Sequence, residues 1–253
     1  MITTNDSYKP EYYIQFARLE INNFWFCSRN RLILWAIKRY CPNKSKFLEI
    51  GCGTGFVMSA IEKAFPYFSL YGSDIYTEGI KFARERSRQA KLFLMDARRI
   101  PFKGKFDIIG AFDILEHIKE DDLVLTQMHQ ALRKDGRIIL TVPQHNFLWS
   151  RFDKASCHLR RYNAAELRNR VKKSGFEIMK TTSFVSLLFP LLCISRLGEK
   201  RSSLKEYNVT QIAEFGSVIN SLLRKILDFE RGLIRLGLYF PFGGSFLLVA
   251  RKT

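Results

Sequence analysis

Short apolar runs of strand length alternate with amphipathic segments along residues 46–142. This rhythm is typical of parallel strands joined by crossover helices, because both faces of such a sheet are buried. The expected strands are residues 46–51, 67–74, 91–96, 105–112 and 136–142, and the expected helices are 54–65, 77–89 and 117–134.

The pattern changes on either side of this region. Residues 11–40 look helical with a break near Asn22–Asn23, and Pro42 ends them. After residue 142 we expect a helix at 163–175, strands at 176–184 and 245–252, a mobile loop at 198–206 and a helix at 209–238. The apolar stripe expected along that last helix is Ile212, Phe215, Ile219, Leu222, Leu223, Ile226, Phe229 and Leu233.

The charge is large and uneven. The 253 residues carry a formal net charge of +17; residues 147–253 hold 19 Lys+Arg against 8 Asp+Glu, a balance of +11, and residues 1–146 hold 22 against 16, a balance of +6. An anionic partner would explain this excess, whether nucleic acid, membrane lipid or a phosphorylated substrate. A basic, solvated surface would explain it equally well.

Cysteine usage and the N-terminal sequence bear on location. The five cysteines are scattered without a CxxC pair, so we expect neither disulfides nor a metal site, and a reducing cytoplasm. The first residues lack a basic-then-apolar signal pattern. The apolar stretch 184–194 is shorter than the roughly 20 residues that span a bilayer, which leaves a place in the core or at a membrane surface.

The stretch "FLEIGCGTGF" at residues 47–56 places a glycine turn between a strand and a helix. Such a turn suits nucleotide binding, because glycine lets a ligand touch the backbone and the helix start offers free N–H groups. The spacing of Gly51, Gly53 and Gly55 fits neither a dinucleotide fingerprint nor a phosphate-binding P-loop. Glu49 before the turn would repel a pyrophosphate and suits a cation or an amino group.

Four blocks in order resemble class I S-adenosylmethionine-dependent methyltransferases: "LEIGCGTG", "YGSD", "LMDARRIPF" and "FDIIGAFDILEHI". The resemblance implies S-adenosylmethionine as cofactor, with the glycines at its methionine part, Asp74 at the ribose hydroxyls and Asp96 at the adenine amino group. The cofactor residues expected on this basis are Arg29, Glu49, Gly51, Cys52, Gly53, Gly55, Asp74, Ile75, Asp96, Ala97 and Phe112.

The resemblance also implies the architecture. We expect an α/β fold, Rossmann-like and doubly wound, with a mostly parallel seven-stranded sheet and helices on both faces. N-terminal helices and a helical, apolar insertion before the last strand would complete it. The expected division is a helical lid at 1–42, a cofactor-binding core at 43–182, an acceptor-side or membrane-facing insertion at 183–244 and a final strand at 245–253.

The stretch "TVPQHNFLWSRFDKASCHLRRYNAAEL" at 141–167 is similar to the methyltransferase domain type 11/12 subgroup, as are residues 20–33 and 239–252. Many members of that subgroup occur in settings of cell-surface polysaccharide or lipid modification. One departure is Cys157, which stands where the subgroup tends to have glycine before the histidine.

Acceptor-side chemistry is expected in this stretch. His145 and His158 are the candidate general bases, since histidine takes up a proton near neutral pH, although loop histidines often only cap turns. The expected substrate-binding residues are Trp25, Trp149, Arg160, Arg161 and Tyr162. The arginines could instead be solvated or pair with Asp153, and His117 is expected to start a helix.

Three functions remain open from the sequence. The first is methyl transfer to oxygen or nitrogen of a small or lipid-linked acceptor, by a cytoplasmic protein that associates peripherally with an anionic membrane surface. The second is an RNA methyltransferase, which the charge suggests but which lacks a base-pocket motif at 112–115. The third is a cofactor-binding regulator without transferase activity.

Overall fold

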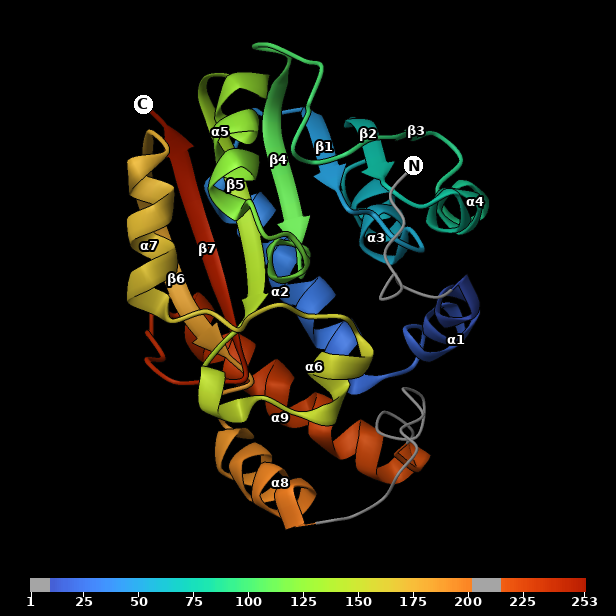
Figure 1. The fold of residues 1–253 in the computed structure, drawn as a ribbon, viewed down its shortest axis with the longest axis vertical. Helices are drawn as coiled ribbons and strands as arrows, with labels where there is room; N and C mark the ends of the chain where they lie inside the picture. Colours follow the sequence, from blue (N-terminus) through green and yellow to red (C-terminus); the bar gives the residue numbers. More distant parts are fainter. Residues whose placement is uncertain (1–9, 202–214) are drawn as a thin grey trace.

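The computed structural model describes residues 10–201 and 215–253 (Figure 1). A seven-stranded sheet in the order β3-β2-β1-β4-β5-β7-β6 forms its centre. Only β7 runs antiparallel to its neighbours, β5 and β6, so the predicted fold class is confirmed. The strands are β1 (Lys46–Ile50), β2 (Ser69–Asp74), β3 (Lys91–Leu94), β4 (Phe106–Phe112), β5 (Leu132–Pro143), β6 (Phe176–Phe184) and β7 (Ser245–Lys252).

Helices cover both faces of the sheet, and each face has its own core. Neighbouring residues of β1 point to opposite sides, so Phe47 belongs to one core and Leu48 to the other. Helices α2 (Phe24–Tyr40), α3 (Phe56–Ala64), α4 (Thr77–Arg86) and α9 (Ser217–Arg235) pack on the Phe47 side. Helices α5 (Asp121–Ala131) and α7 (Ala164–Lys173) pack on the Leu48 side.

The remaining elements lie around the carboxyl ends of the parallel strands (Figure 1). They are α1 (Pro10–Leu19), the 3₁₀ turns η1 (Leu115–His117) and η2 (Asn146–Leu148), α6 (Arg151–Ala155) and α8 (Phe189–Arg201). Strands β1 and β4 are neighbours, and the chain continues outward from them in opposite directions. In open α/β sheets the crevice at such a switch point is where ligands bind.

One predicted boundary is confirmed and two are wrong. The break near Asn22–Asn23 exists, because the Asn23 side chain accepts the N–H of Trp25 at 2.9 Å and caps α2. The helix expected at 117–134 is a separate 3₁₀ turn followed by α5, and β5 begins at Leu132, which pairs with Phe106 of β4.

The segment around α8 differs from the sequence-based expectation. Helix α8 continues through 198–201, where a loop was expected, and residues 202–206 lie outside the described residues, as does 209–214 of the predicted helix 209–238. The described part of that helix, α9, runs from Ser217 to Arg235.

The stripe predicted for α9 is wrong in part. Its buried face is Leu223, Leu227, Glu230 and Ile234. Glu230 is 2% exposed and accepts the backbone N–H groups of Ser186 and Leu187, both at 2.7 Å, at the turn that leads into α8. A carboxylate thus occupies the buried face of α9, which a pattern of apolar residues cannot predict. Three residues of the predicted stripe, Ile219, Leu222 and Phe229, are exposed.

Candidate active site

A cavity of about 460 Å³ opens at the carboxyl edge of the sheet, beside the glycine turn. Aromatic side chains from several elements contribute to its wall, among them Phe16, Trp25, Phe26, Phe56, Phe112 and Phe152. Among the residues predicted from sequence, the structure brings nine to this cavity: Trp25, Arg29, Glu49, Gly51, Cys52, Gly53, Phe112, His158 and Arg161.

The three glycines of the turn have positive φ angles but differ in what surrounds them. A Cβ on Gly51 would lie 2.6 Å from the Ile114 side chain, and one on Gly55 would lie 2.7 Å from Cα of Ala83 in α4. A Cβ on Gly53 would meet nothing within 4 Å. Packing therefore favours glycine at 51 and 55. At Gly53 the φ of +50° also favours glycine, but the space beside it belongs to the cavity and not to packed protein atoms.

Asp74 ends β2 directly beneath this turn. Its carboxylate accepts the N–H of Gly53 at 2.8 Å and that of Tyr76 at 2.9 Å. Burial raises the pKa of Asp74, and the hydrogen bonds from those two groups and from the Tyr13 hydroxyl of α1 oppose the rise. The acidic residue is thus tied to the glycine turn, and α1 covers it.

The β3 end of the predicted cofactor site lies outside the cavity wall. Asp96 accepts hydrogen bonds from Arg98, with Nη2 at 2.7 Å, which lowers its pKa. Ile75 is 46% exposed and Ala97 is buried. An adenine amino group would therefore have to share the Asp96 carboxylate with Arg98.

Glu49 is a buried carboxylate without a hydrogen-bond partner for its Oε2 among the residues that the structure describes. It is 2% exposed and lines the cavity. Burial raises its pKa well above the ordinary value of 4.5, although the nearby charge of Arg29 opposes the rise. A cationic group that entered the cavity would find an acceptor here.

Arg29 of α2 lines the same cavity as Glu49 of β1. Its guanidinium pairs with Asp113, which follows β4, and its carbon Cζ lies 4.7 Å from the centroid of the Trp25 ring. Among the described residues its Nε has no partner. Asp113 also accepts the hydroxyl of Thr141 at 2.9 Å, so the arginine is anchored while its Nε–H is left for a ligand.

These features fit S-adenosylmethionine, the cofactor that the resemblance implies. Gly53 leaves room for close approach to the backbone, Glu49 can meet an amino group or sulfonium, and Arg29 can meet a carboxylate. Cys52, which also lines the cavity, is fixed through its N–H to the carbonyl of Ser73 at 2.9 Å. The individual contacts stay predictions.

His158 enters the cavity with its orientation fixed by Asp153. Its Nδ1 lies 2.8 Å from Oδ1 of Asp153, which also accepts Nε–H of Arg161 at 2.9 Å. Burial alone would raise the pKa of Asp153, but hydrogen bonds from His158, Arg161 and Ser150 hold it far below its usual range. The ionised carboxylate accepts from Nδ1, which leaves Nε2 of His158 for other chemistry.

The residue before this histidine has the geometry that its position demands. Cys157 has φ +57°, in the left-handed region where glycine is favoured. The backbone at Cys157 therefore adopts a conformation that favours glycine, and a side chain there is strained.

No sequence pattern singled out Glu116, and His117 was expected only in a structural role. Both line the cavity beside His158, and the rings of His117 and His158 are nearly perpendicular with centroids 4.8 Å apart. Glu116 is fully buried, and neither of its carboxylate oxygens has a hydrogen-bond partner in the part of the chain that the structure describes. The only signal was "DILEHI" after β4, and His117 ends a 3₁₀ turn rather than starting a helix.

His145 and Trp149 do not reach the cavity wall. The His145 ring lies among aromatic rings, with centroids 5.2 Å from Phe147, 5.5 Å from Phe189 and 5.8 Å from Phe242. Burial lowers the pKa of His145, with the charge of Arg161 adding to the effect. Of the two candidate bases, only His158 is placed at the site.

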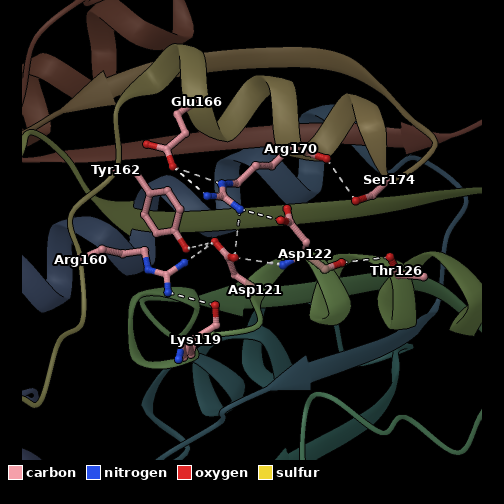
Figure 2. A network of polar contacts seen from close by, with 9 residues as sticks. All are labelled: Lys119, Asp121, Asp122, Thr126, Arg160, Tyr162, Glu166, Arg170 and Ser174. Carbon is pink, nitrogen blue, oxygen red and sulfur yellow. Dashed lines mark hydrogen bonds and ion pairs between the residues drawn. The ribbon is translucent and has the colours of Figure 1, made fainter.

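Arg160 and Tyr162 belong to a separate polar network (Figure 2). The Tyr162 hydroxyl donates to Asp121 at 2.7 Å, and Arg160 pairs with Asp121 at 3.0 Å. Arg170 of α7 joins the same carboxylate at 3.2 Å. Tyr162 is fully buried, so the two residues expected to bind substrate instead fasten the stretch after His158 to α5 and α7.

Comparisons with known proteins agree on the type of domain. The model of the methyltransferase domain family matches residues 21–181. A probable S-adenosylmethionine-dependent methyltransferase of Mycolicibacterium smegmatis is 24% identical over 162 residues, which cover 63% of this chain and 62% of that protein. A fatty-acid O-methyltransferase of the same organism is 31% identical over 99 residues, 38% of this chain and 36% of that protein.

Among solved structures, phosphoethanolamine N-methyltransferase 2 of Haemonchus contortus in complex with S-adenosyl-L-methionine superposes with a TM-score of 0.63. The match covers 98% of this chain and 58% of that one, at 19% identity, which shows a shared fold. The matched region spans less than two thirds of each of these relatives.

Proposed function

The chain belongs to the methyltransferase domain family of class I S-adenosylmethionine-dependent enzymes, and from this we propose that it methylates an oxygen or nitrogen of a small or lipid-linked acceptor at a membrane surface. The observation that carries the proposal is the cavity itself. It joins the Gly53 turn to the Asp153–His158 pair within one aromatic wall.

The cofactor half follows from the residues around the turn. S-adenosylmethionine supplies an electrophilic methyl carbon on a sulfonium, so a nucleophile takes the methyl group and the carbon–sulfur electron pair stays with sulfur. Gly53, Glu49 and Arg29 would hold its amino-acid part, and Asp74 its ribose. Asp74 would exchange the Tyr13 hydroxyl for ribose hydroxyls, since both are hydrogen-bond donors to a carboxylate.

The acceptor half rests on His158. With Nδ1 bound to the ionised Asp153, Nε2 can take the proton of an acceptor hydroxyl or ammonium. The acceptor oxygen or nitrogen then has a lone pair with which to take the methyl group. Asp153 stabilises the histidine cation that forms, and Arg161 keeps that carboxylate in place. The aromatic wall would help to keep water from the reacting atoms once substrate and cofactor are bound.

The surface around α8 and α9 supports a lipid-linked acceptor. The two helices lie together at one end of the molecule (Figure 1). On α8, Leu191 is 57% exposed and Ile194 is 66% exposed, while Leu192 and Ser195 of the same helix line the cavity. An apolar surface next to the cavity, in the part of the chain with a charge of +11, suits an anionic bilayer.

Among the described residues no helix combines the length and the apolar character needed to cross a bilayer. In this proposal, association occurs at the membrane interface, through the exposed side chains of α8 and α9 and through basic residues.

The test is incubation of the full chain with methyl-labelled S-adenosylmethionine and separated cell fractions of lipids, RNA, proteins and small molecules. We expect label in the lipid or small-molecule fraction. Label in RNA, with binding that weakens steeply as salt rises, would replace the proposal with an RNA methyltransferase. Cofactor binding without label in any fraction would replace it with a regulatory protein.

The membrane part has its own test. We expect the protein to cosediment with vesicles of phosphatidylglycerol and phosphatidylcholine, and Leu191→Glu with Ile194→Glu to abolish this. Leu123→Glu on α5 is the matched control, since Leu123 is 43% exposed but lies on another helix. Equal loss in both proteins, or no wild-type binding, would remove the membrane surface from the proposal.

A further inference from the structure

Three side chains with metal-binding atoms converge beside the acceptor end of the cavity. Glu116 and His117 belong to η1, and His158 comes from the turn after α6. One ligand atom from each residue lies within 4.8 Å of the others. We propose that Glu116, His117 and His158 form a binding site for a divalent transition-metal ion of the zinc type.

The unpartnered carboxylate is the first reason. Glu116 is 0% exposed, and among the described residues neither Oε1 nor Oε2 has a hydrogen-bond partner. A buried polar group without a partner is destabilising, and more so when it is charged, so such a group calls for a partner such as an ordered water, a ligand or an ion. Here the same carboxylate lines a cavity that a ligand can enter.

The orientation of the two imidazoles is the second reason. Metal-binding histidines nearly always donate their other ring N–H to a carboxylate or a carbonyl, which fixes the ring and the tautomer. Nδ1 of His158 bonds to Asp153 at 2.8 Å, and the His117 ring is hydrogen-bonded to the backbone of Cys157. Both histidines therefore have one ring nitrogen engaged in this way and the other left for an ion.

The framework around the three ligands is already connected. The N–H of Leu159 donates to the carbonyl of Glu116 at 2.8 Å, so the turn that carries His158 is fastened to η1 by the backbone. Asp153 is in turn held by Ser150 and Arg161. Ligand atoms bonded at about 2.1 Å in a tetrahedral site lie roughly 3.4 Å apart, so atoms that are 4.8 Å apart must approach by about 1.4 Å. The Glu116 carboxylate can make this movement because no hydrogen bond holds it.

The ligand types select the ion. Two imidazoles with one carboxylate suit Zn²⁺, Co²⁺ or Fe²⁺ and leave at least one coordination position open, whereas Mg²⁺ and Ca²⁺ prefer oxygen ligands. This proposal departs from the expectation, drawn from the cysteine pattern, that the chain has no metal site. The inference rests on the proposed function for the identity of the acceptor, which would occupy the open position.

An ion would change the role of His158. Its Nε2 would be committed to the metal, and a hydroxyl bound at the open position would lose its proton to solvent because the ion lowers the pKa of the hydroxyl. Glu116→Gln separates the two roles, since it removes the carboxylate ligand and leaves the Asp153–His158 pair intact.

The experiment measures metal binding without cofactor or acceptor, so its failure is distinct from failure of methyl transfer. Chelator-treated full-length protein is titrated with Co²⁺, followed by visible absorption, and Zn²⁺ is then added as competitor. We expect one equivalent of Co²⁺ with a spectrum of nitrogen and oxygen ligands, displaced by Zn²⁺. Glu116→Gln and His117→Asn should weaken binding by more than the roughly 10- to 100-fold typical of losing an outer partner.

Two further variants make the result specific. Asp153→Asn, which touches only the orienting carboxylate, should weaken Co²⁺ binding by about 10- to 100-fold. His129→Asn removes a histidine outside the cluster and should leave binding unchanged. Circular dichroism and thermal unfolding show whether each variant folds. Absence of stoichiometric Co²⁺ binding by the wild-type protein, or equal binding by folded Glu116→Gln, would overturn the inference.

Discussion

Gly53→Ala tests whether the glycine turn keeps space for a ligand. The Cβ would project into space with no protein atom within 4 Å, in a residue that lines the cavity. Gly104 provides a matched control, because its φ of +53° is close to the +50° of Gly53 and its Cβ would also meet nothing within 4 Å. Gly104 lies in an exposed turn before β4, outside the cavity wall.

The two substitutions should cost the same stability. Alanine in the left-handed region costs about 1–2 kcal/mol, and the reduced freedom of the unfolded chain returns about 0.4–1 kcal/mol. The net loss is roughly 1 kcal/mol, which corresponds to a fall in Tm of about 2–4 °C for a chain of this size. Differential scanning calorimetry should show this shift for both variants.

Only Gly53→Ala should weaken cofactor binding. Overlap of one methyl group with a closely packed ligand costs about 1–3 kcal/mol, which raises Kd roughly 5- to 150-fold. Isothermal titration calorimetry with S-adenosylmethionine measures this directly, with Gly104→Ala expected to match the wild type. If Gly53→Ala also binds like the wild type, the ligand does not contact this backbone and the argument from the turn is refuted.

Three other substitutions test the site. Because burial raises the pKa of Glu49 above 4.5, the folded state holds this proton more tightly, and that advantage is lost as pH rises from 4.5 through the folded pKa. Glu49→Gln should therefore have a higher Tm than the wild type at about pH 7 but not at about pH 4, and it should bind S-adenosylmethionine more weakly. If the variant and the wild type have equal Tm values at both pH values, this expectation is contradicted. His158→Asn should lower kcat by about 10²–10⁴-fold in the labelled assay while His145→Asn keeps activity, and the reverse order would place the acceptor at His145. Cys157→Gly should raise Tm, because residue 157 has a φ of +57°, where glycine is favoured. Cys193→Gly, inside α8, should lower the free energy of unfolding by about 1 kcal/mol and so lower Tm. Tm shifts of the same sign for both variants would refute the strain at Cys157.

Local periodicity predicted most of the fold, because strands and helices of this sheet carry their patterns within single segments. It failed where a tertiary partner decides. The start of β5 at Leu132 depends on pairing with Phe106, and the buried face of α9 depends on Glu230 meeting the backbone at Ser186. No pattern within 117–134 or 209–238 contains that information.

The site divides in the same way. Asp74 and the glycine turn are contiguous with the strands that place them, so the sequence alone predicted the end of the cavity where the cofactor is expected. Gly51 and Gly55 proved to be required by Ile114 and Ala83, which are distant in the chain.

The sequence by itself determined the cofactor class, since a strand, a glycine turn and an acidic strand end form one local unit. Only the tertiary structure decided which of the loop residues reach the reacting end. Arg160 and Tyr162 are the neighbours of Arg161 in the chain, but both bind Asp121 outside the cavity wall. Arg161 and His158 instead bind Asp153 and line the cavity. The physical reason is that a buried carboxylate needs a charged or hydrogen-bonding partner, and that partner is often distant in the sequence. The proximity of His158 to Glu116 and His117 therefore cannot be predicted from the sequence pattern.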